Sequence, residues 1–144
     1  ELKHKPENST QRLYAKNHEI SFEGKELLKV SAAKAFKGDP ALLNPEDLLL
    51  SSVTSCHMMS YLFVCSQNNI EVLSYEDYSE AILEVNANGS GKITQIILKP
   101  IIKIKDSSQS ELALSLHHKA NELCFIANSC NFPIEHHATI ETEN

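Results

Sequence analysis

A long apolar segment that begins with a strong helix-start signal constrains this chain more than any other feature. Asn44 can accept a hydrogen bond from the first free N–H groups of a helix, and Pro45 has a φ angle suited to the first helical position. Glu46 and Asp47 then place negative charge against the positive end of that helix. Apolar residues follow on nearly every face as far as residues 67–69. The pattern predicts a long central helix that is buried almost all round.

The segments on either side of this helix predict one α+β domain over residues 1–144, in which residues 1–11 form a loose N-terminal arm. The other elements expected in chain order are a β-hairpin at 18–32, strands at 70–73, 78–86 and 92–104, a second helix, and a last strand at 134–141. The simplest pairing of the three middle strands is a meander. Pro100 marks a bulge, an edge or a break in the third of them, because proline lacks a backbone donor.

The second helix carries its own start and stop signals. Ser107 or Ser108 can cap it, and Glu111, three residues past Ser108, makes a capping box possible. We expect the helix to end before Pro133. Cys124 would lie within it, on a face of small and partly polar residues.

Composition excludes several classes of function. The formal net charge is −6, and Arg12 is the one arginine in the chain, which argues against a nucleic-acid surface. The N-terminal residues lack the apolar core of a secretory signal, and we expect no apolar run long enough to span a bilayer. The sequence therefore predicts a cytoplasmic protein that binds neither nucleic acid nor membrane.

The cysteines and histidines do not predict a metal centre. The four cysteines, Cys56, Cys65, Cys124 and Cys130, are too few and too widely spaced for the disulfide framework of a small secreted domain. Of the two pairs of adjacent histidines, His117 and His118 cannot both face one ion, since neighbours on a helix point about 100° apart. No Cys-x-x-Cys or His-x-x-x-His spacing, typical of zinc ligands, is present. We expect no metal and no cofactor, and interpret the thiols as redox or packing residues.

Cys56 lies inside the first helix with apolar residues on its own face. Desolvation is expected to raise its pKa unless a cation arrives from elsewhere, because the residue is too far along the helix for the dipole to act. His57 points about 100° away from it, so we interpret His57 as a packed core or interface histidine rather than a base. Cys65 faces away from Cys56 and is interpreted as packing.

Two motifs resemble those of the OsmC/Ohr family of osmotically inducible and organic-hydroperoxide-resistance proteins. The first is Asn-Pro-Glu-Asp-Leu-Leu at 44–49, followed by Ser-Cys-His-Met at 55–58, and the second is Glu-Leu-Cys-Phe-Ile-Ala-Asn-Ser at 122–129. The resemblance covers almost the whole chain. It implies an OsmC-like fold, an intertwined homodimer with the two long helices at its centre, and thiol-based reduction of organic hydroperoxides at the subunit interface.

The resemblance also implies residue roles. Cys56 would be the peroxidatic cysteine, Cys124 the resolving cysteine, and Glu46 the carboxylate that holds a catalytic arginine. This chain departs from the family pattern at that arginine, because Lys16 stands within about a residue of its position. Arg12 lies four residues earlier, and either cation remains a candidate.

Two functions follow. The first is a thiol peroxidase without a cofactor that forms a Cys56–Cys124 disulfide, which the family resemblance implies is reduced again by a dithiol such as a lipoyl group. The alternative is a catalytically weak OsmC-like protein that binds a hydrophobic small molecule in the interfacial pocket around Cys56. Lysine in place of arginine favours the alternative, because lysine cannot form the two-pronged contacts of a guanidinium. Cys130 is the weaker candidate for the resolving thiol.

Overall fold

The structure of the chain is a computed structural model that describes residues 1–4 and 16–143. The chain divides into two compact units, residues 1–49 and residues 50–144. The boundary falls inside the first long helix, so the first turn of that helix belongs to the first unit. Arg12 lies outside the described residues.

The first unit contains a small antiparallel sheet, which confirms the predicted hairpin. Its strands pair in the order β1-β2-β3, and a short 3₁₀ helix follows. The bounds are β1 Leu2–Lys3, β2 His18–Ile20, β3 Leu28–Val30 and η1 Lys34–Phe36. Residues 2 and 3, at the start of the expected loose arm, form the edge strand β1 and pair with β2.

The long helix α1 spans Pro45–Gln67 and starts where the sequence predicts. The Asp47 N–H donates to Asn44 Oδ1 at 2.8 Å, and the Asn44 N–H donates to Asp47 Oδ2 at 3.1 Å. Two backbone donors are thus satisfied reciprocally, as in a capping box. The chain leaves the helix at Asn69, whose φ of 57° is left-handed.

Helix α1 is not buried all round, and that part of the prediction is wrong for the single chain. Its buried side chains form one stripe, made up of Val53, His57, Tyr61, Val64 and Cys65. Successive members are mostly three or four residues apart, which is the spacing of one helical face. Away from this stripe the helix exposes large apolar side chains.

Helix α1 is also long and apolar enough to cross a membrane, judged by length and composition alone. The expectation that no apolar run reaches that length is therefore wrong. Core helices of soluble proteins pass the same test, so the finding is weak evidence for a membrane span.

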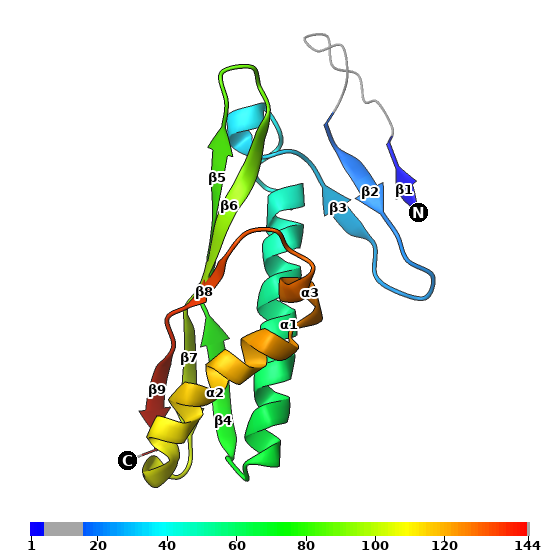
Figure 1. Cartoon of the computed structure of the whole chain (residues 1–144). Coiled ribbons are helices and arrows are strands. Elements are labelled where there is room, and N and C mark those ends of the chain that lie inside the picture. The colour runs from blue at the N-terminus through cyan, green and yellow to red at the C-terminus, as the bar shows by residue number, and fades with distance from the viewer. Residues whose placement is uncertain (5–15, 144) are drawn as a thin grey trace. The chain divides into compact units, whose positions relative to one another are not determined.

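The strands after α1 form a long bent hairpin rather than a meander (Figure 1). Strand β5 pairs with β6 across the turn, and β4 pairs with β7, both antiparallel. The bounds are β4 Val72–Asp77, β5 Glu80–Val85, β6 Gly91–Leu98 and β7 Pro100–Ile104. Of the bulge, edge or break predicted at Pro100, the structure shows a break: β7 begins there, and the preceding N–H of Lys99 donates to the Asp77 side chain at 2.8 Å.

The last predicted strand is also split in two. Strand β8, Ile134–His136, lies parallel to β6, and strand β9, Thr139–Thr142, lies parallel to β7. The second unit therefore contains two three-stranded sheets, with orders β4-β7-β9 and β5-β6-β8.

The second helix begins differently from the prediction and ends earlier. A 3₁₀ turn η2, Ser107–Gln109, is capped by Asp106, whose Oδ1 accepts from the Ser108 N–H at 2.9 Å. Helix α2, Ser110–Leu123, follows directly. The chain then leaves helical geometry at Cys124 and resumes it in the short helix α3, Phe125–Asn128.

Two apolar clusters form the core of the second unit. The larger joins α1, α2 and the sheet that contains β7, with Tyr61, Ile102 and Ala120 fully buried. The smaller joins α1 to the other sheet through Val53, Ile96 and others. A buried hydrogen bond from the Tyr61 hydroxyl to the Ala113 carbonyl, at 2.8 Å, links α1 to α2 directly.

We expect Tyr61→Phe to lower the free energy of unfolding by about 1 kcal/mol, because it removes one buried hydrogen bond and keeps the ring in place. Urea unfolding followed by circular dichroism measures the change. Tyr78→Phe is the matched control: its exposed hydroxyl contacts Glu76 at 3.3 Å. An equal loss of unfolding free energy in both variants would show that the Tyr61–Ala113 hydrogen bond itself contributes nothing to stability.

Candidate active site

The structure brings together two of the cysteines that the sequence singles out. The thiol of Cys124, on the segment after α2, hydrogen-bonds the sulfur of Cys56, in the middle of α1. Cys124 is fully buried, whereas Cys56 is partly exposed, and both are free thiols. They lie 68 positions apart in sequence (124 − 56), so the fold alone makes them neighbours.

Cys124 is positioned by the break between α2 and α3. Its backbone is extended, with φ −73° and ψ 109°, and it serves as the N-cap residue of α3. Its Sγ accepts a hydrogen bond from the Ala127 N–H at 3.4 Å. The expectation of one continuous helix through Cys124 is therefore wrong, and the thiol lies at a helix start rather than on a helical face.

Helix α3 also supplies donors to the other thiol. Burial raises the pKa of Cys56, but hydrogen bonds from the Ile126 N–H, the Cys124 thiol, the Phe125 N–H and the Ser60 hydroxyl outweigh it. The net effect is a pKa below the ordinary value for cysteine. In the single chain these donors lower the pKa without a cation, because backbone N–H groups also stabilise a thiolate.

The second thiol is shifted in the opposite direction. Burial raises the pKa of Cys124 to about 11, although the N–H of Ala127 opposes the shift. The contact with Cys56 raises it further, because a charged Cys56 disfavours a second thiolate beside it. At neutral pH Cys124 therefore keeps its proton and donates it to the Cys56 sulfur.

An apolar pocket of ≈ 370 Å³ opens beside the Cys56 sulfur. It is lined by Cys56, Met59, Ser60, Phe63, Leu123 and Phe125. Apart from the thiol and one hydroxyl, every lining residue is a large apolar side chain. The pocket therefore suits a small hydrophobic molecule that presents one reactive group to the sulfur.

The rings of three histidines, two of them buried, lie close together, which the sequence does not predict. His57 Nε2 lies 3.1 Å from His117 Nδ1, and the His117 ring stacks on Tyr61 with 3.8 Å between centroids. The ring of His136 lies 5.9 Å from that of His57. Among the described residues, no group of three or more His, Cys, Asp or Glu side chains is arranged to hold a metal ion.

Burial keeps these imidazoles neutral. It lowers the pKa of His57 to about 4 and that of His117 to about 3, and the neighbouring histidines add to both shifts. The pKa of His136 is also lowered, mainly by burial. His57 is thus a buried histidine, as predicted, but its Nδ1 has no hydrogen-bond partner among the described residues.

Comparison with known proteins identifies the family of this chain. The sequence profile described as OsmC-like protein matches residues 37–139, well over half of the chain. The chain belongs to the OsmC-like family. Both thiols, the three histidines and the apolar pocket lie within the matched region.

Several known proteins are similar to this chain in fold or in sequence. An OsmC-like protein of unknown function from Vibrio cholerae has a TM-score of 0.85 and 27% identity, over 95% of each chain. An organic hydroperoxide resistance protein from Elizabethkingia anophelis has a TM-score of 0.69 and 19% identity, over 93% of this chain and 100% of its own. The uncharacterized protein YmaD of Bacillus subtilis is 26% identical over 115 residues, which are 78% of this chain and 76% of YmaD.

The other site residues predicted for this OsmC-like chain lie in the first unit or outside the described residues. Glu46 is in the first turn of α1. Lys16 precedes β2, and its carbonyl oxygen accepts from His18 Nδ1 at 2.9 Å. Arg12 falls among residues that the structure does not describe. The roles of these three residues toward Cys56 stay predictions.

The two remaining cysteines are packed away from the pair. Cys65 is buried in the larger apolar cluster. Cys130 packs against the smaller cluster, its thiol donates to the Ile126 carbonyl at 3.3 Å, and burial raises its pKa. Neither residue lines the pocket beside Cys56.

We expect the protein to lose stability as the pH falls from about 6.5 toward 4. His57 and His117 have folded-state pKa values below the ordinary histidine value of 6.5, so the unfolded chain binds more protons in that range. Each unit of pKa difference is worth about 1.4 kcal/mol, which predicts a loss of a few kcal/mol. Urea unfolding between pH 4.5 and pH 7.5 (about the range of histidine titration) measures the slope.

His117→Gln tests the origin of that slope, because it removes the buried titrating group. The matched control is His118→Gln. His118 is the next residue on α2, its side chain is exposed, and it pairs with Glu122 at 3.2 Å. The dependence of the free energy of unfolding on pH should be weaker in His117→Gln than in the wild type and unchanged in His118→Gln. The same slope in His117→Gln and the wild type would contradict the assignment.

We further expect Ser60→Ala to raise the Cys56 pKa, since it removes one donor to the thiolate. Alkylation by iodoacetamide at neutral pH should slow several-fold, and the pH dependence of its rate gives the pKa. Ser66→Ala is the control: Ser66 lies on the same helix, and its hydroxyl donates to the Phe63 carbonyl at 2.7 Å. A Ser60→Ala profile identical to that of the control would contradict this role.

Proposed function

We propose that this OsmC-like protein is a thiol peroxidase that reduces organic hydroperoxides. The observation that carries the proposal is the pair formed by a low-pKa Cys56 and a protonated Cys124 at the edge of an apolar pocket. A thiolate is the nucleophile that attacks an O–O bond, and a neighbouring thiol collapses the sulfenic acid before further oxidation. The fold is shared with a protein named as an organic hydroperoxide resistance protein.

The proposed reaction uses both thiols in turn. The Cys56 thiolate attacks the terminal oxygen of the hydroperoxide, its O–O bond breaks, and the alkoxide leaves with the electron pair and takes a proton from solvent to become an alcohol. Cys56 is then a sulfenic acid. The sulfur of Cys124 attacks the Cys56 sulfur, hydroxide leaves, and the Cys124 proton converts it to water.

The resulting Cys56–Cys124 disulfide is the oxidised form of the pair, because the two thiols have given up the two electrons that reduced the peroxide. A dithiol reductant, such as a lipoyl group, restores both thiols by exchange through a mixed disulfide. The partly exposed sulfur of Cys56 is the accessible end for that attack, because Cys124 is fully buried. No bound cofactor takes part in this scheme, and its setting is the cytoplasm.

The active form in this proposal is an intertwined homodimer. Around the pocket the single chain exposes Met59 and Phe63 by more than half and Phe125 by 82%. Apolar surface of this kind, gathered at one site, marks an interface or a ligand site. A partner subunit that covers this face of α1 would exclude water from the thiols.

In the proposed dimer, Glu46 and Lys16 act near Cys56 across the subunit interface. About 15 Å of helix axis separates Glu46 from Cys56 in one chain, at 1.5 Å per residue, so direct contact within α1 is excluded. A two-fold axis across a pair of α1 helices would bring the start of one beside the middle of the other. The partner's Glu46 would then orient Lys16, or Arg12, near the thiolate.

The alternative is an OsmC-like protein that binds a hydrophobic compound in the pocket beside Cys56 with little turnover. The apolar lining of that pocket supports it equally well. A peroxide-consumption assay separates the two functions, because binding alone consumes no peroxide.

We expect Cys56→Ser to reduce the consumption of cumene hydroperoxide, with a dithiol as reductant, to the uncatalysed background. Cys124→Ser should complete one oxidation and then stall or over-oxidise, because it can break the O–O bond but cannot rescue the product. Mass spectrometry of Cys56 distinguishes a sulfenic acid from its over-oxidised forms.

Cys130→Ser is the matched control for these variants and should turn over like the wild type. A stall in Cys130→Ser together with normal turnover in Cys124→Ser would reassign the resolving thiol. Absence of consumption by the wild type, with saturable binding of the hydrophobic compound, would favour the alternative function.

We expect sedimentation velocity to show a dimer at micromolar concentration, because the exposed apolar side chains around Cys56 are too many for a stable monomer surface. Phe63→Glu should shift the population toward monomer by placing a charge in that surface. A well-folded monomer of the wild type at the same concentration would remove the interfacial active site from the proposal.

A further inference from the structure

A second pocket lies on the face of α1 opposite the thiol pair. Thr54 and Met58 line it, and each is two residues from Cys56, which is about 200° of rotation on a helix. The pocket has a volume of ≈ 420 Å³ and lies wholly in the second unit. It is lined by Leu50, Ser51, Thr54, Ser55, Met58, Tyr75, Asp77 and Ser79.

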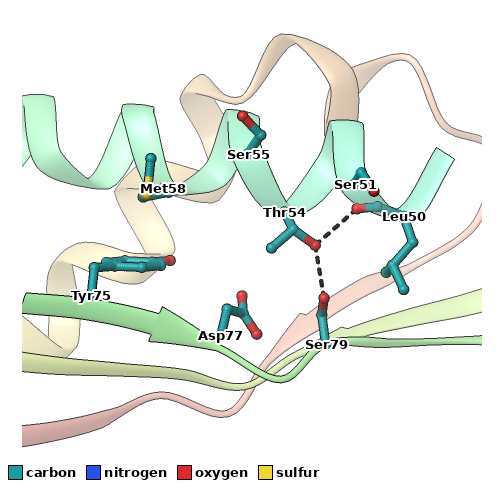
Figure 2. Close-up of a pocket in the computed structure, with 8 residues that line it drawn as sticks. All are labelled: Leu50, Ser51, Thr54, Ser55, Met58, Tyr75, Asp77 and Ser79. Atoms are coloured by element: carbon teal, nitrogen blue, oxygen red, sulfur yellow. Dashed lines mark hydrogen bonds between the residues drawn. The ribbon is translucent and has the colours of Figure 1, made fainter. Parts of the chain in front are cut away.

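Two polar side chains at this pocket have buried atoms with no hydrogen-bond partner among the described residues. They are the Tyr75 hydroxyl and Asp77 Oδ2. Figure 2 shows Asp77 between Tyr75 and Ser79, with its carboxylate facing α1 and the Tyr75 hydroxyl extending toward the same space. Buried polar atoms are almost always hydrogen-bonded, so two unpartnered atoms in one pocket point to a ligand.

Other polar atoms beside these two already have hydrogen-bond partners. The Thr54 and Ser79 hydroxyls hydrogen-bond each other at 2.8 Å. The other oxygen of Asp77, Oδ1, accepts from the Lys99 N–H at 2.8 Å. That bond anchors the carboxylate and leaves Oδ2 directed into the pocket.

The charge of the pocket is not balanced by its own lining. Asp77 is the one charged residue among the lining side chains. The ammonium of Lys99 pairs with Glu80 at 3.2 Å instead, on the exposed surface. Burial raises the pKa of Asp77, because the carboxylate loses water, although the Lys99 N–H opposes the shift. A cationic hydrogen-bond donor would supply both the missing charge and the missing bond.

The lining distinguishes between kinds of cation. Calcium takes six to eight oxygen ligands, and the pocket offers one carboxylate. Leu50 and Met58 provide apolar surface at the same pocket, which suits an alkyl chain. The volume lies at the small end of the range for organic ligands.

We propose that this pocket binds a small primary alkylammonium compound. The ammonium donates to Asp77 Oδ2 and to the oxygen of Tyr75, and the alkyl chain lies against Leu50 and Met58. The site does not involve Cys56 or Cys124, and it is independent of the peroxidase proposal.

The test titrates the full-length ¹⁵N-labelled protein with n-butylammonium chloride. The reporter is the backbone amide signal of Lys99, because its N–H is bonded to the same carboxylate. We expect a saturable shift of that signal. The neutral isostere n-butanol should bind at least tenfold more weakly, and sodium chloride at equal concentration should give no saturable shift. A wild type without a saturable shift, or with equal affinities for the amine and the alcohol, overturns the proposal.

Matched variants locate the binding atoms. Asp77→Asn keeps the shape and the acceptor for Lys99 but removes the charge, and we expect the affinity to fall at least tenfold. Tyr75→Phe should weaken binding several-fold. Glu76→Gln is the control, because it removes an exposed carboxylate from the next position of β4, and it should bind like the wild type.

Unchanged affinity in Asp77→Asn overturns the proposal. Should that variant fail to fold, as judged by its amide spectrum, Tyr75→Phe decides: affinity equal to the wild type in that variant overturns the proposal as well. An equal loss in Glu76→Gln and Asp77→Asn also overturns it, because it would show a general effect of net charge rather than a site at Oδ2.

Discussion

The chain leaves helical geometry at Cys124, and the chemistry of both thiols depends on that break. The first N–H groups of any helix have no intrahelical partner, so a helix start offers donors that a helix interior does not. Here the N–H groups of Phe125 and Ile126 serve Cys56, and that of Ala127 serves Cys124. Had α2 continued through this point, the same groups would have been bonded to carbonyls one turn earlier.

The arrangement separates the two thiols by environment rather than by residue type. Both cysteines lose water on folding, and for each the loss raises the pKa. Only Cys56 gains enough donors to reverse the effect, and one of them is the thiol of Cys124 itself. A buried thiol that keeps its proton therefore stabilises a thiolate beside it, which gives the two thiols unequal pKa values although their side chains are chemically identical.

Local signals were sufficient for much of the fold. The reciprocal bonds of Asn44 and Asp47, the hairpin of β2 and β3 and the break at Pro100 all depend on residues close together in sequence, and each is where the sequence predicts it. The predicted meander failed because β4 pairs with β7 across the β5–β6 hairpin, and alternating patterns do not record which strands pair. The predicted cap of the second helix, Ser107 or Ser108, was wrong because Asp106 caps the preceding turn η2 instead.

The sequence by itself determined that the chain is an OsmC-like α+β protein with a long helix that carries Cys56, because motifs, helix caps and apolar periodicity are properties of neighbouring residues. Tertiary structure decided the pKa of that thiol, the meeting of three histidines and the pocket at Asp77. These depend on which distant groups pack together. The decisive donors to Cys56 include backbone N–H groups, which nearly every residue carries, so no side-chain pattern in the sequence could reveal them.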